Sequence, residues 1–398
     1  MKNRLLVLSI LMMFAFMANA QSEKESTNEI LNAAAKLLGE RDSKLQIGAY
    51  GEINFNQPYG NGIRSTGELD VQRFVTFFAY KFNNRVDFVA EVEFEHVKEV
   101  YVEQAFIRYR LNDFMNLRAG LLLIPMGIIN EYHESTTFNG VERPRIANKV
   151  IPTTWREIGA GLSGKFMDAG LKYQIYLVNG LNGYNGSGKF NGGGLRSGRQ
   201  KGAQSYMSSP NLSFKVDYFG TKNLNLGFAG YFGKSQSTMF DGLDTTDDFL
   251  VAQADSSRIG LKMFGLDARY NNNGFAFRAA YIFGSMSNTA EYNALTGKDM
   301  GSKFYGFYAE AAYDLFRLFD MDTDQALTAF IRYEDYNTQS DVEAGTTQLD
   351  KYAVHDIVTG LGYKIADGVV LKADLQFRKA KDADSYSKQF NAGVAIWF

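Results

Sequence analysis

The residues that could perform covalent chemistry are few in this chain. Its three histidines are His96, His133 and His355, and none has a second candidate ligand at a spacing typical of a metal site. His133 and Glu134 are followed by Ser-Thr-Thr, so they do not form an H-E-x-x-H zinc motif. The chain has no cysteine, no G-x-S-x-G nucleophile elbow and no Walker A phosphate loop. We therefore expect a protein that is not an enzyme and that needs neither a metal nor a cofactor.

Charged residues and prolines gather between residues 124 and 157. This stretch holds three of the 5 prolines. Its charged residues are Glu131, Glu134, Glu142, Arg143, Arg145, Lys149, Arg156 and Glu157. A rigid segment of mixed charge suits folding into a wide barrel and narrowing it, because opposed acidic and basic walls create a transverse field that favours polar solutes. The alternative is that these charges only solvate an exposed loop.

The elements that would position this segment are β-strands. In residues 85–96, Val86, Phe88 and Val92 alternate with Asp87, Glu91 and Glu93, and no helical period fits. Glutamates in a row on one strand face are costly in a soluble core but ordinary on the wall of a water-filled lumen. The same pattern predicts sixteen strands, over residues 44–56, 68–82, 85–96, 100–111, 115–123, 155–166, 170–179, 211–219, 223–233, 257–270, 274–285, 303–314, 326–337, 354–365, 368–379 and 387–398. In residues 257–270 the apolar phase slips near Gly265, which predicts a bulge there.

Many charged residues fall on the face of the strands that we assign to the lumen wall. The basic ones include Arg108, Arg110, Arg118, Lys262 and Arg332, and the acidic ones include Glu91, Glu93 and Glu334. Most of them would pair across strands. The near balance of signs predicts at most a modest ion selectivity, with a weak anion preference if the loop arginines dominate the narrowest point.

The connections between the predicted strands alternate between short turns and long loops. The long ones are 57–67, 124–154, 180–210, 234–256, 286–302, 338–353 and 380–386. Outer-membrane barrels have short periplasmic turns, long external loops and an even number of strands. We therefore expect an all-β fold, a 16-stranded antiparallel transmembrane β-barrel over residues 44–398, with 124–154 as its constriction loop.

The composition is consistent with this fold and excludes other classes. The chain has 398 residues, 39 Gly, only 5 Pro, 14% aromatic residues and a formal net charge of −2. With 45% hydrophobic residues it is not disordered, and its near-neutral charge gives no support for a nucleic-acid partner. After the first twenty residues, no segment is apolar and long enough to form a transmembrane helix.

Both ends of the chain carry signals for export and assembly. Residues 1–20 combine Lys2 and Arg4, an apolar run and Ala18-Asn19-Ala20, which predicts a cleaved signal peptide. Residues 21–43 would form a periplasmic segment with a short helix at 26–39, either a frayed leader or a helix that self-associates beneath an oligomer. The terminal Phe398 follows the alternating pattern and is expected to be part of the signal that the barrel assembly machinery reads.

Four sequence blocks resemble a known family. They are Glu131 to Pro144 (EYHESTTFNGVERP), Ile151 to Glu157 (IPTTWRE), Phe330 to Thr338 (FIRYEDYNT) and Val369 to Asp374 (VVLKAD). The chain resembles the Bacteroidota outer-membrane porins of the phosphate-selective porin O and P type. This resemblance implies a 16-stranded barrel, a homotrimer and an inward-folded third loop. Phosphate-selective members use a strongly basic ladder, whereas this barrel is nearly charge-balanced, so phosphate specificity is not carried over.

These observations lead to one expected function and two alternatives. We expect an outer-membrane porin that lets small polar or anionic solutes diffuse passively through a water-filled barrel in the lipid bilayer. The first alternative is an anion-selective channel for phosphate or an organic anion. The second is a closed barrel whose loops bind a partner.

Overall fold

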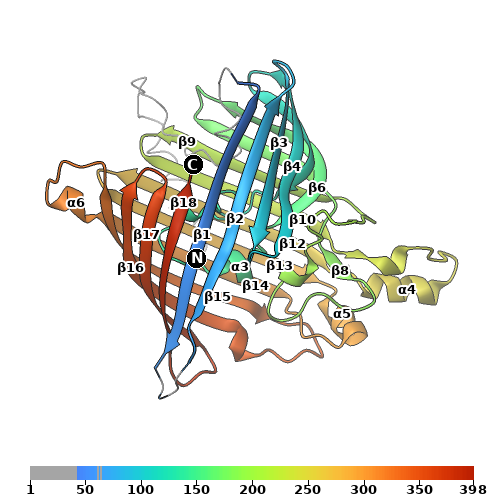
Figure 1. Ribbon diagram of the computed structural model, residues 1–398. Helices are drawn as coiled ribbons and strands as arrows, with labels where there is room; N and C mark the ends of the chain where they lie inside the picture. Colours follow the sequence, from blue (N-terminus) through green and yellow to red (C-terminus); the bar gives the residue numbers. More distant parts are fainter. Residues whose placement is uncertain (1–42, 61, 63–64) are drawn as a thin grey trace, which may run out of the picture.

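The computed structural model describes residues 43–60, 62 and 65–398, and in these residues sixteen antiparallel strands close into one barrel (Figure 1). The sixteen-stranded fold is therefore confirmed. The strands are β1 (Leu45–Tyr59), β2 (Glu68–Lys81), β3 (Val86–Glu95), β4 (Glu99–Asn112), β5 (Met115–Leu123), β6 (Arg156–Phe166), β7 (Leu171–Val178), β9 (Asn211–Thr221), β10 (Leu224–Lys234), β12 (Gly260–Asn272), β13 (Phe275–Ser287), β14 (Lys303–Asp314), β15 (Ala326–Asp341), β16 (Ala353–Ala366), β17 (Val369–Ala380) and β18 (Ser387–Trp397).

Each barrel strand pairs with the next one along the chain, and the last returns to the first. β1 pairs with β18 from Tyr50 opposite Trp397 to Tyr59 opposite Lys388. The backbone of Phe398 extends this pairing, because its N–H donates to the carbonyl of Ala49 at 2.9 Å and its own carbonyl accepts from the Ala49 N–H at 2.9 Å. Closure leaves no unpaired strand edge.

The two ends of the barrel differ, as the connection lengths predict. At one end the strands are joined by short turns, except for the connection that holds α6 (Leu315–Leu318). The long loops gather at the other end, where Figure 1 shows α4, α5 and β8 away from α6. These loops contain η1 (Ser135–Thr137), α3 (Ile146–Lys149), β8 (Asn182–Tyr184), η2 (Arg196–Gly198), β11 (Gln236–Ser237), η3 (Thr238–Phe240), α4 (Asp248–Ser256), α5 (Thr289–Thr296) and η4 (Asp350–Tyr352). The small parallel pair of β8 and β11 was not expected.

The barrel wall has apolar side chains on its outer face and polar side chains on its inner face, which is the reverse of a soluble protein. On β3 the outward Phe94 is 39% exposed, whereas Glu91 and Glu93 on the inner face are buried. The same exposed apolar outer face recurs on β17, at Leu371 and Leu375. The period-two alternation thus assigns apolar side chains to the outside and polar ones to the lumen, as predicted.

The expected bulge near Gly265 is wrong. β12 keeps an uninterrupted register with β10 and with β13 through this position. The inward residues Leu261 and Met263 are apolar because they join a buried core inside the barrel. The change in the apolar pattern therefore reflects this core and not a change in the strand register. As a consequence Lys262, which we assigned to the lumen wall, is exposed and lies on the outer face between these two buried residues.

An apolar core fills part of the lumen. It joins inward side chains of the wall, such as Tyr231 and Ile282, to residues of the segment 124–155, such as Met126, Ile151 and Trp155. Inward apolar residues on this part of the wall are therefore packed against the inserted loop and not against water.

The expected signal peptide 1–20 and the expected helix 26–39 lie outside the described residues. Within the described part of the chain, no helix is both long enough and apolar enough to cross a membrane.

Candidate functional site

The segment between β5 and β6, residues 124–155, folds into the barrel and is fastened by two buried lysines. Lys372 on β17 donates from its Nζ to the backbone carbonyls of Ser135, Phe138 and Gly140. Lys215 on β9 donates to the carbonyl of Gly127 at 2.9 Å, and its Nζ lies 3.1 Å from the carboxylate of Glu131. The two anchoring strands are far apart around the barrel, so the loop crosses the lumen.

Acidic groups of the wall hold the second half of this loop. The N–H of Val141 donates to Asp374 at 2.7 Å, and the N–H of Ile146, the first residue of α3, donates to Glu334 at 3.2 Å. Arg332 pairs with Glu334 at 2.8 Å and also donates to the carbonyl of Glu142 at 3.4 Å. Arg332 and Glu334, assigned to the lumen wall from sequence, therefore act on the loop backbone.

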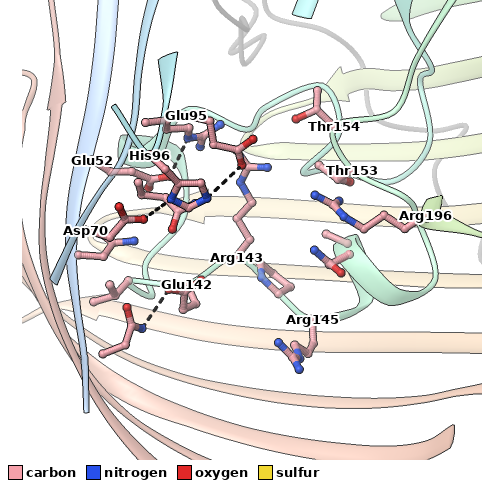
Figure 2. Close-up of a pocket in the computed structure, with 18 of the residues that line it drawn as sticks. Glu52, Asp70, Glu95, His96, Glu142, Arg143, Arg145, Thr153, Thr154 and Arg196 are labelled. Atoms are coloured by element: carbon pink, nitrogen blue, oxygen red, sulfur yellow. Dashed lines mark hydrogen bonds and ion pairs between the residues drawn. The ribbon is translucent and has the colours of Figure 1, made fainter. Parts of the chain in front are cut away.

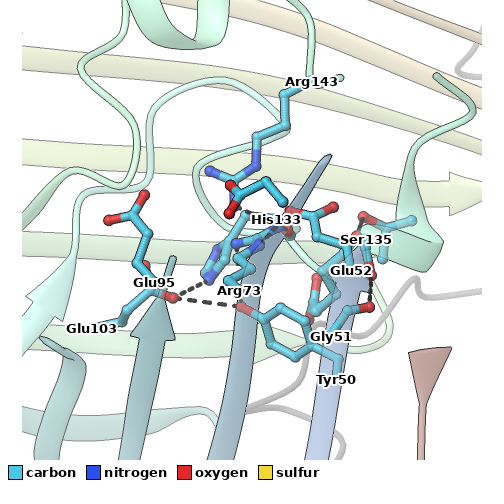
Figure 3. Close-up of polar contacts among 12 residues, drawn as sticks. Tyr50, Gly51, Glu52, Arg73, Glu95, Glu103, His133, Ser135 and Arg143 are labelled. Atoms are coloured by element: carbon cyan, nitrogen blue, oxygen red, sulfur yellow. Dashed lines mark hydrogen bonds and ion pairs between the residues drawn. The ribbon is translucent and has the colours of Figure 1, made fainter. Parts of the chain in front are cut away.

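His133 fastens the loop to β3 and β4 (Figure 3). Its Nε2 lies 2.9 Å from Glu103 and 3.5 Å from Glu91, and its carbonyl accepts a hydrogen bond from Arg73. Burial by itself lowers the pKa of His133, but the neighbouring carboxylates outweigh burial and raise that pKa well above its usual value. The imidazole is thus held in its charged form, hydrogen-bonded to Glu103 and ion-paired with Glu91.

The same three side chains form the one group of possible metal ligands found among the described residues. Glu91, Glu103 and His133 offer ligand atoms within 4.8 Å of one another. Arg156 lies 3.9 Å from Glu103, however, and the charged imidazole is ion-paired with both carboxylates. Buried charges need partners of opposite sign, and in this cluster the side chains pair with one another and leave no need for a metal ion.

A cavity of about 380 Å³ lies between the inserted loop and one side of the wall (Figure 2). The wall residues that line it come from β1 to β4 and from β17 and β18. Its acidic side is formed by Glu52, Glu68, Asp70, Glu93, Glu95 and Glu142. His96 sits within this side, with Nδ1 against Asp70 and Nε2 3.9 Å from Glu95.

The opposite side of the cavity is basic. It is formed by Arg145, Arg156, Arg196, Arg199 and Lys201, from the inserted loop, the start of β6 and the connection 179–210. Arg143 also lines the cavity, and it donates to the carbonyl of His133 at 3.4 Å, the same carbonyl that accepts from Arg73. Figure 2 shows Arg145 and Arg196 across from Asp70 and Glu95. The two sides give the cavity a transverse field of the kind that the sequence predicts for the 124–157 segment alone.

The expected constriction residues separate into three groups. Glu142, Arg143, Arg145 and Arg156 line the cavity. Lys149 lines a second cavity of about 420 Å³ beside Tyr336 and Tyr352, where burial and the guanidinium of Arg145 lower the pKa of its ammonium. Glu131, Glu134 and Glu157 are buried and do not line the first cavity. Glu157 accepts hydrogen bonds from Trp155 at 2.9 Å and from Tyr231 at 3.0 Å.

The expected wall residues also differ in their surroundings. Glu93 lines the cavity, whereas Arg108 pairs with Asp87 and Arg118 donates to the hydroxyl of Tyr176 at 3.2 Å. Arg110, two residues beyond Arg108 on the same face, is exposed near the end of β4. Pairing across the sheet is therefore seen for Arg108, and Arg332 likewise pairs with Glu310 of the neighbouring strand at 3.3 Å, whereas the other wall charges have different partners.

Sequence reasoning missed the contribution of the glycine-rich connection 179–210. From sequence, 180–210 is only one of the long connections, yet this segment holds β8 and η2 and supplies Arg196, Arg199 and Lys201 to the cavity. One of its glycines permits this packing, because Gly194 has φ +116° and a side chain there would meet the carbonyl of Lys149. Three basic residues within six positions, with no acidic residue among them, were the available signal.

No family model matches this chain. An uncharacterized protein of Aquifex aeolicus is 30% identical over 368 residues, which cover 89% of this chain and 81% of the relative. The chain belongs to the same family as this Aquifex protein.

Similar solved structures show which fold this family has. An anion-selective porin of Comamonas acidovorans superimposes with a TM-score of 0.56 at 11% identity, covering 89% of this chain and 100% of the other. OmpF of Salmonella typhi gives a TM-score of 0.53 at 13% identity, covering 89% and 97%. OmpT of Vibrio cholerae gives 0.52 at 11% identity, covering 90% and 99%. At these identities the likeness is one of fold, so the chain has the closed β-barrel fold of porins.

Proposed function

We propose that this protein is a porin of the Gram-negative outer membrane that lets small hydrophilic solutes diffuse passively across it. The observation that carries the proposal is the combination of a closed barrel, a loop fixed across its lumen and a charged cavity left beside that loop. A polar solute that enters such a cavity replaces its contacts with water by contacts with charged side chains. An apolar solute gains no such contacts, so the cavity favours polar solutes.

The outer surface supports the membrane location. Leu371, Leu375 and Phe390 stand exposed on the outside of neighbouring strands, where lipid would cover them. We infer that residues 1–20 are removed as a signal peptide and that Phe398 is read during assembly. The barrel would then have its long loops outside the cell and its short turns in the periplasm.

We also propose a more specific family relationship and an oligomeric state. The four sequence blocks support a relationship to the phosphate-selective porin O and P type of Bacteroidota. That resemblance implies a homotrimer, which chemical cross-linking of the purified protein in detergent would reveal as a band of three chains.

The decisive experiment is single-channel recording of the purified, folded protein in a planar bilayer, with the reversal potential taken across a KCl gradient. We expect stable open steps and a small reversal potential. No conductance from protein whose folding is verified by its heat-dependent mobility on a gel would refute the porin function and favour a closed barrel with partner-binding loops.

An anion-selective channel is the second candidate. It is favoured by the basic side of the cavity, because Arg143, Arg145, Arg196, Arg199 and Lys201 have no carboxylate within 4.0 Å in the described part of the chain. The barrel is also similar in fold to the anion-selective porin of Comamonas acidovorans, which adds to this candidate. A strongly anion-selective reversal potential, with current blocked by millimolar phosphate, would favour this anion-selective channel over a general porin.

A further inference from the structure

We propose that the cavity is a binding site for small zwitterionic solutes, with the solute's carboxylate against Arg156, Arg196 and Arg199 and its ammonium group against Glu68, Asp70 and Glu95. This inference rests on the proposed porin function and names the class of solute that the pathway retains.

The basic side of the site has hydrogen-bonding groups without partners. The Nε of Arg156 and the Nη1 of Arg196 are buried and make no hydrogen bond among the described residues. Arg156 is 3% exposed, so its position is set by the surrounding structure. Buried donors without a partner are costly, so these two guanidinium groups are incompletely satisfied by the protein, and a carboxylate in the cavity that they line would offset their charge.

Like charges are crowded on this side. Arg199 donates to the carbonyl of Thr154 at 3.0 Å, but burial and the guanidinium groups of Arg196 and Arg156 lower its pKa to about 9. The Nζ of Lys201 lies 4.1 Å from the centre of the Tyr101 ring and has no ion-pair partner among the described residues. A bound carboxylate would relieve this repulsion.

The acidic side is separated from the basic side by the cavity itself. Glu95 contributes to the electrostatic environment of Arg196, Arg199 and Lys201, yet no ion pair within 4.0 Å joins Glu95 to any of them. Glu68 is exposed to the cavity and Asp70 is held by His96. Opposite charges therefore line the same cavity, and Glu95 forms no ion pair with these basic residues.

A solute that carries both charges can satisfy both sides at once. A simple anion meets only the basic side and is repelled by the acidic carboxylates, and a simple cation meets the opposite problem. Binding one charged end raises the effective concentration of the other end at its own wall, so a zwitterion gains more than the sum of two weak contacts.

The test measures the reduction of KCl conductance by three solutes of matched chain length at pH 7. They are 6-aminohexanoate, hexanoate and hexylammonium, with glycine and 4-aminobutyrate added to vary the distance between the two charges. We expect 6-aminohexanoate or 4-aminobutyrate to reduce the current saturably, at a concentration at least tenfold below that of either singly charged analogue.

Variants of each side separate the two contacts. The pair Arg196→Gln and Arg199→Gln, or the pair Glu68→Gln and Glu95→Gln, should raise the half-blocking concentration of the zwitterion to that of the singly charged analogues. Arg258→Gln and Glu291→Gln, in external loops and away from the cavity lining, are the matched controls and should leave it unchanged. Open-channel conductance of each variant verifies that it has folded.

Equal block by hexanoate and 6-aminohexanoate would overturn the proposal in favour of an anion site. An open channel that none of the solutes blocks would overturn it in favour of unselective diffusion, while leaving the porin function intact. Absence of any conductance is the distinct result that refutes the porin function itself.

Discussion

Lys372 shows how one side chain can control the position of a whole loop. Its ammonium group donates to three backbone carbonyls of the inserted segment. An apolar side chain at this position has no donor for any of these three acceptors. Each buried group left without its partner costs about 1 to 3 kcal/mol. The loop therefore depends on this residue more than the barrel does.

The variant Lys372→Met should release the loop without unfolding the barrel. We expect larger or noisier single-channel conductance, with little change in the temperature at which the purified barrel loses its compact form on a gel. Lys388→Met, an exposed position on β18, is the control. An unaltered current in the Lys372 variant would show that other contacts suffice to hold the loop.

The basic side of the cavity also predicts a pH dependence. Arg199, whose pKa is lowered to about 9, carries its charge below that pH and loses it above. Lys201 shifts in the same direction, because burial and the charge of Arg199 lower its pKa. Because this side of the cavity loses positive charge as these two groups lose their protons, anion preference should fall as the pH rises.

Reversal potentials measured across a KCl gradient at pH 7 and pH 10 test this dependence. We expect the potential to move toward cation preference at pH 10, and to move less in an Arg199→Gln variant. Two results would contradict a role for the charge of Arg199. One is a shift toward anion preference at pH 10, and the other is a shift of the same size in the wild-type protein and in the Arg199→Gln variant.

At the scale of elements, the helix α3 depends on one glycine of the strand beneath it. A Cβ at Gly306 of β14 would lie 2.8 Å from Val150 and 3.3 Å from Ile146, the residues that α3 turns toward the wall. Side chains in packed interiors rarely tolerate such contacts without moving. The glycine lets the helix, and Arg145 before it, stay away from the cavity centre.

Gly306→Val should push α3 from the wall and narrow the cavity, which would lower single-channel conductance. Gly362→Val is a matched control, because a Cβ at Gly362 of β16 meets only Val370, at 3.7 Å. Equal conductance in both variants would show that the helix adapts without moving into the pathway.

At the scale of the whole molecule, Phe398 separates the stability of the barrel from its assembly. Its backbone continues the pairing of β18 with β1, but its side chain is 72% exposed. A substitution at an exposed position without partners usually changes stability by less than about 0.5 kcal/mol. Any larger effect of its removal must arise before folding is complete.

We expect Phe398→Ala to refold in detergent with an unchanged melting temperature but to reach the outer membrane of living cells in much lower amount. Phe390→Ala, which truncates another outward phenylalanine of β18, should have normal assembly. A lowered melting temperature of the Phe398 variant would assign the residue a structural role in place of a signal.

The number and direction of the strands followed from the sequence because their signals are local. Alternation of side chains with a period of two, as in Val86 to Glu95, is a property of each strand and needs no partner to be read. Short polar turns such as Asn83-Asn84 act over a few residues. The accumulated pattern of short turns and long loops was enough to predict a closed barrel with sixteen strands.

Only the tertiary structure decided which charges meet and which part of the lumen is filled. Arg196 and Asp70 are more than a hundred residues apart, and they face the same cavity because the connection 179–210 folds back over the inserted loop. Likewise Leu261 and Met263 look misplaced on an inner wall until the loop that covers them is present. Long-range packing of loops has no periodic signal, because each contact depends on residues that only closure of the barrel brings together.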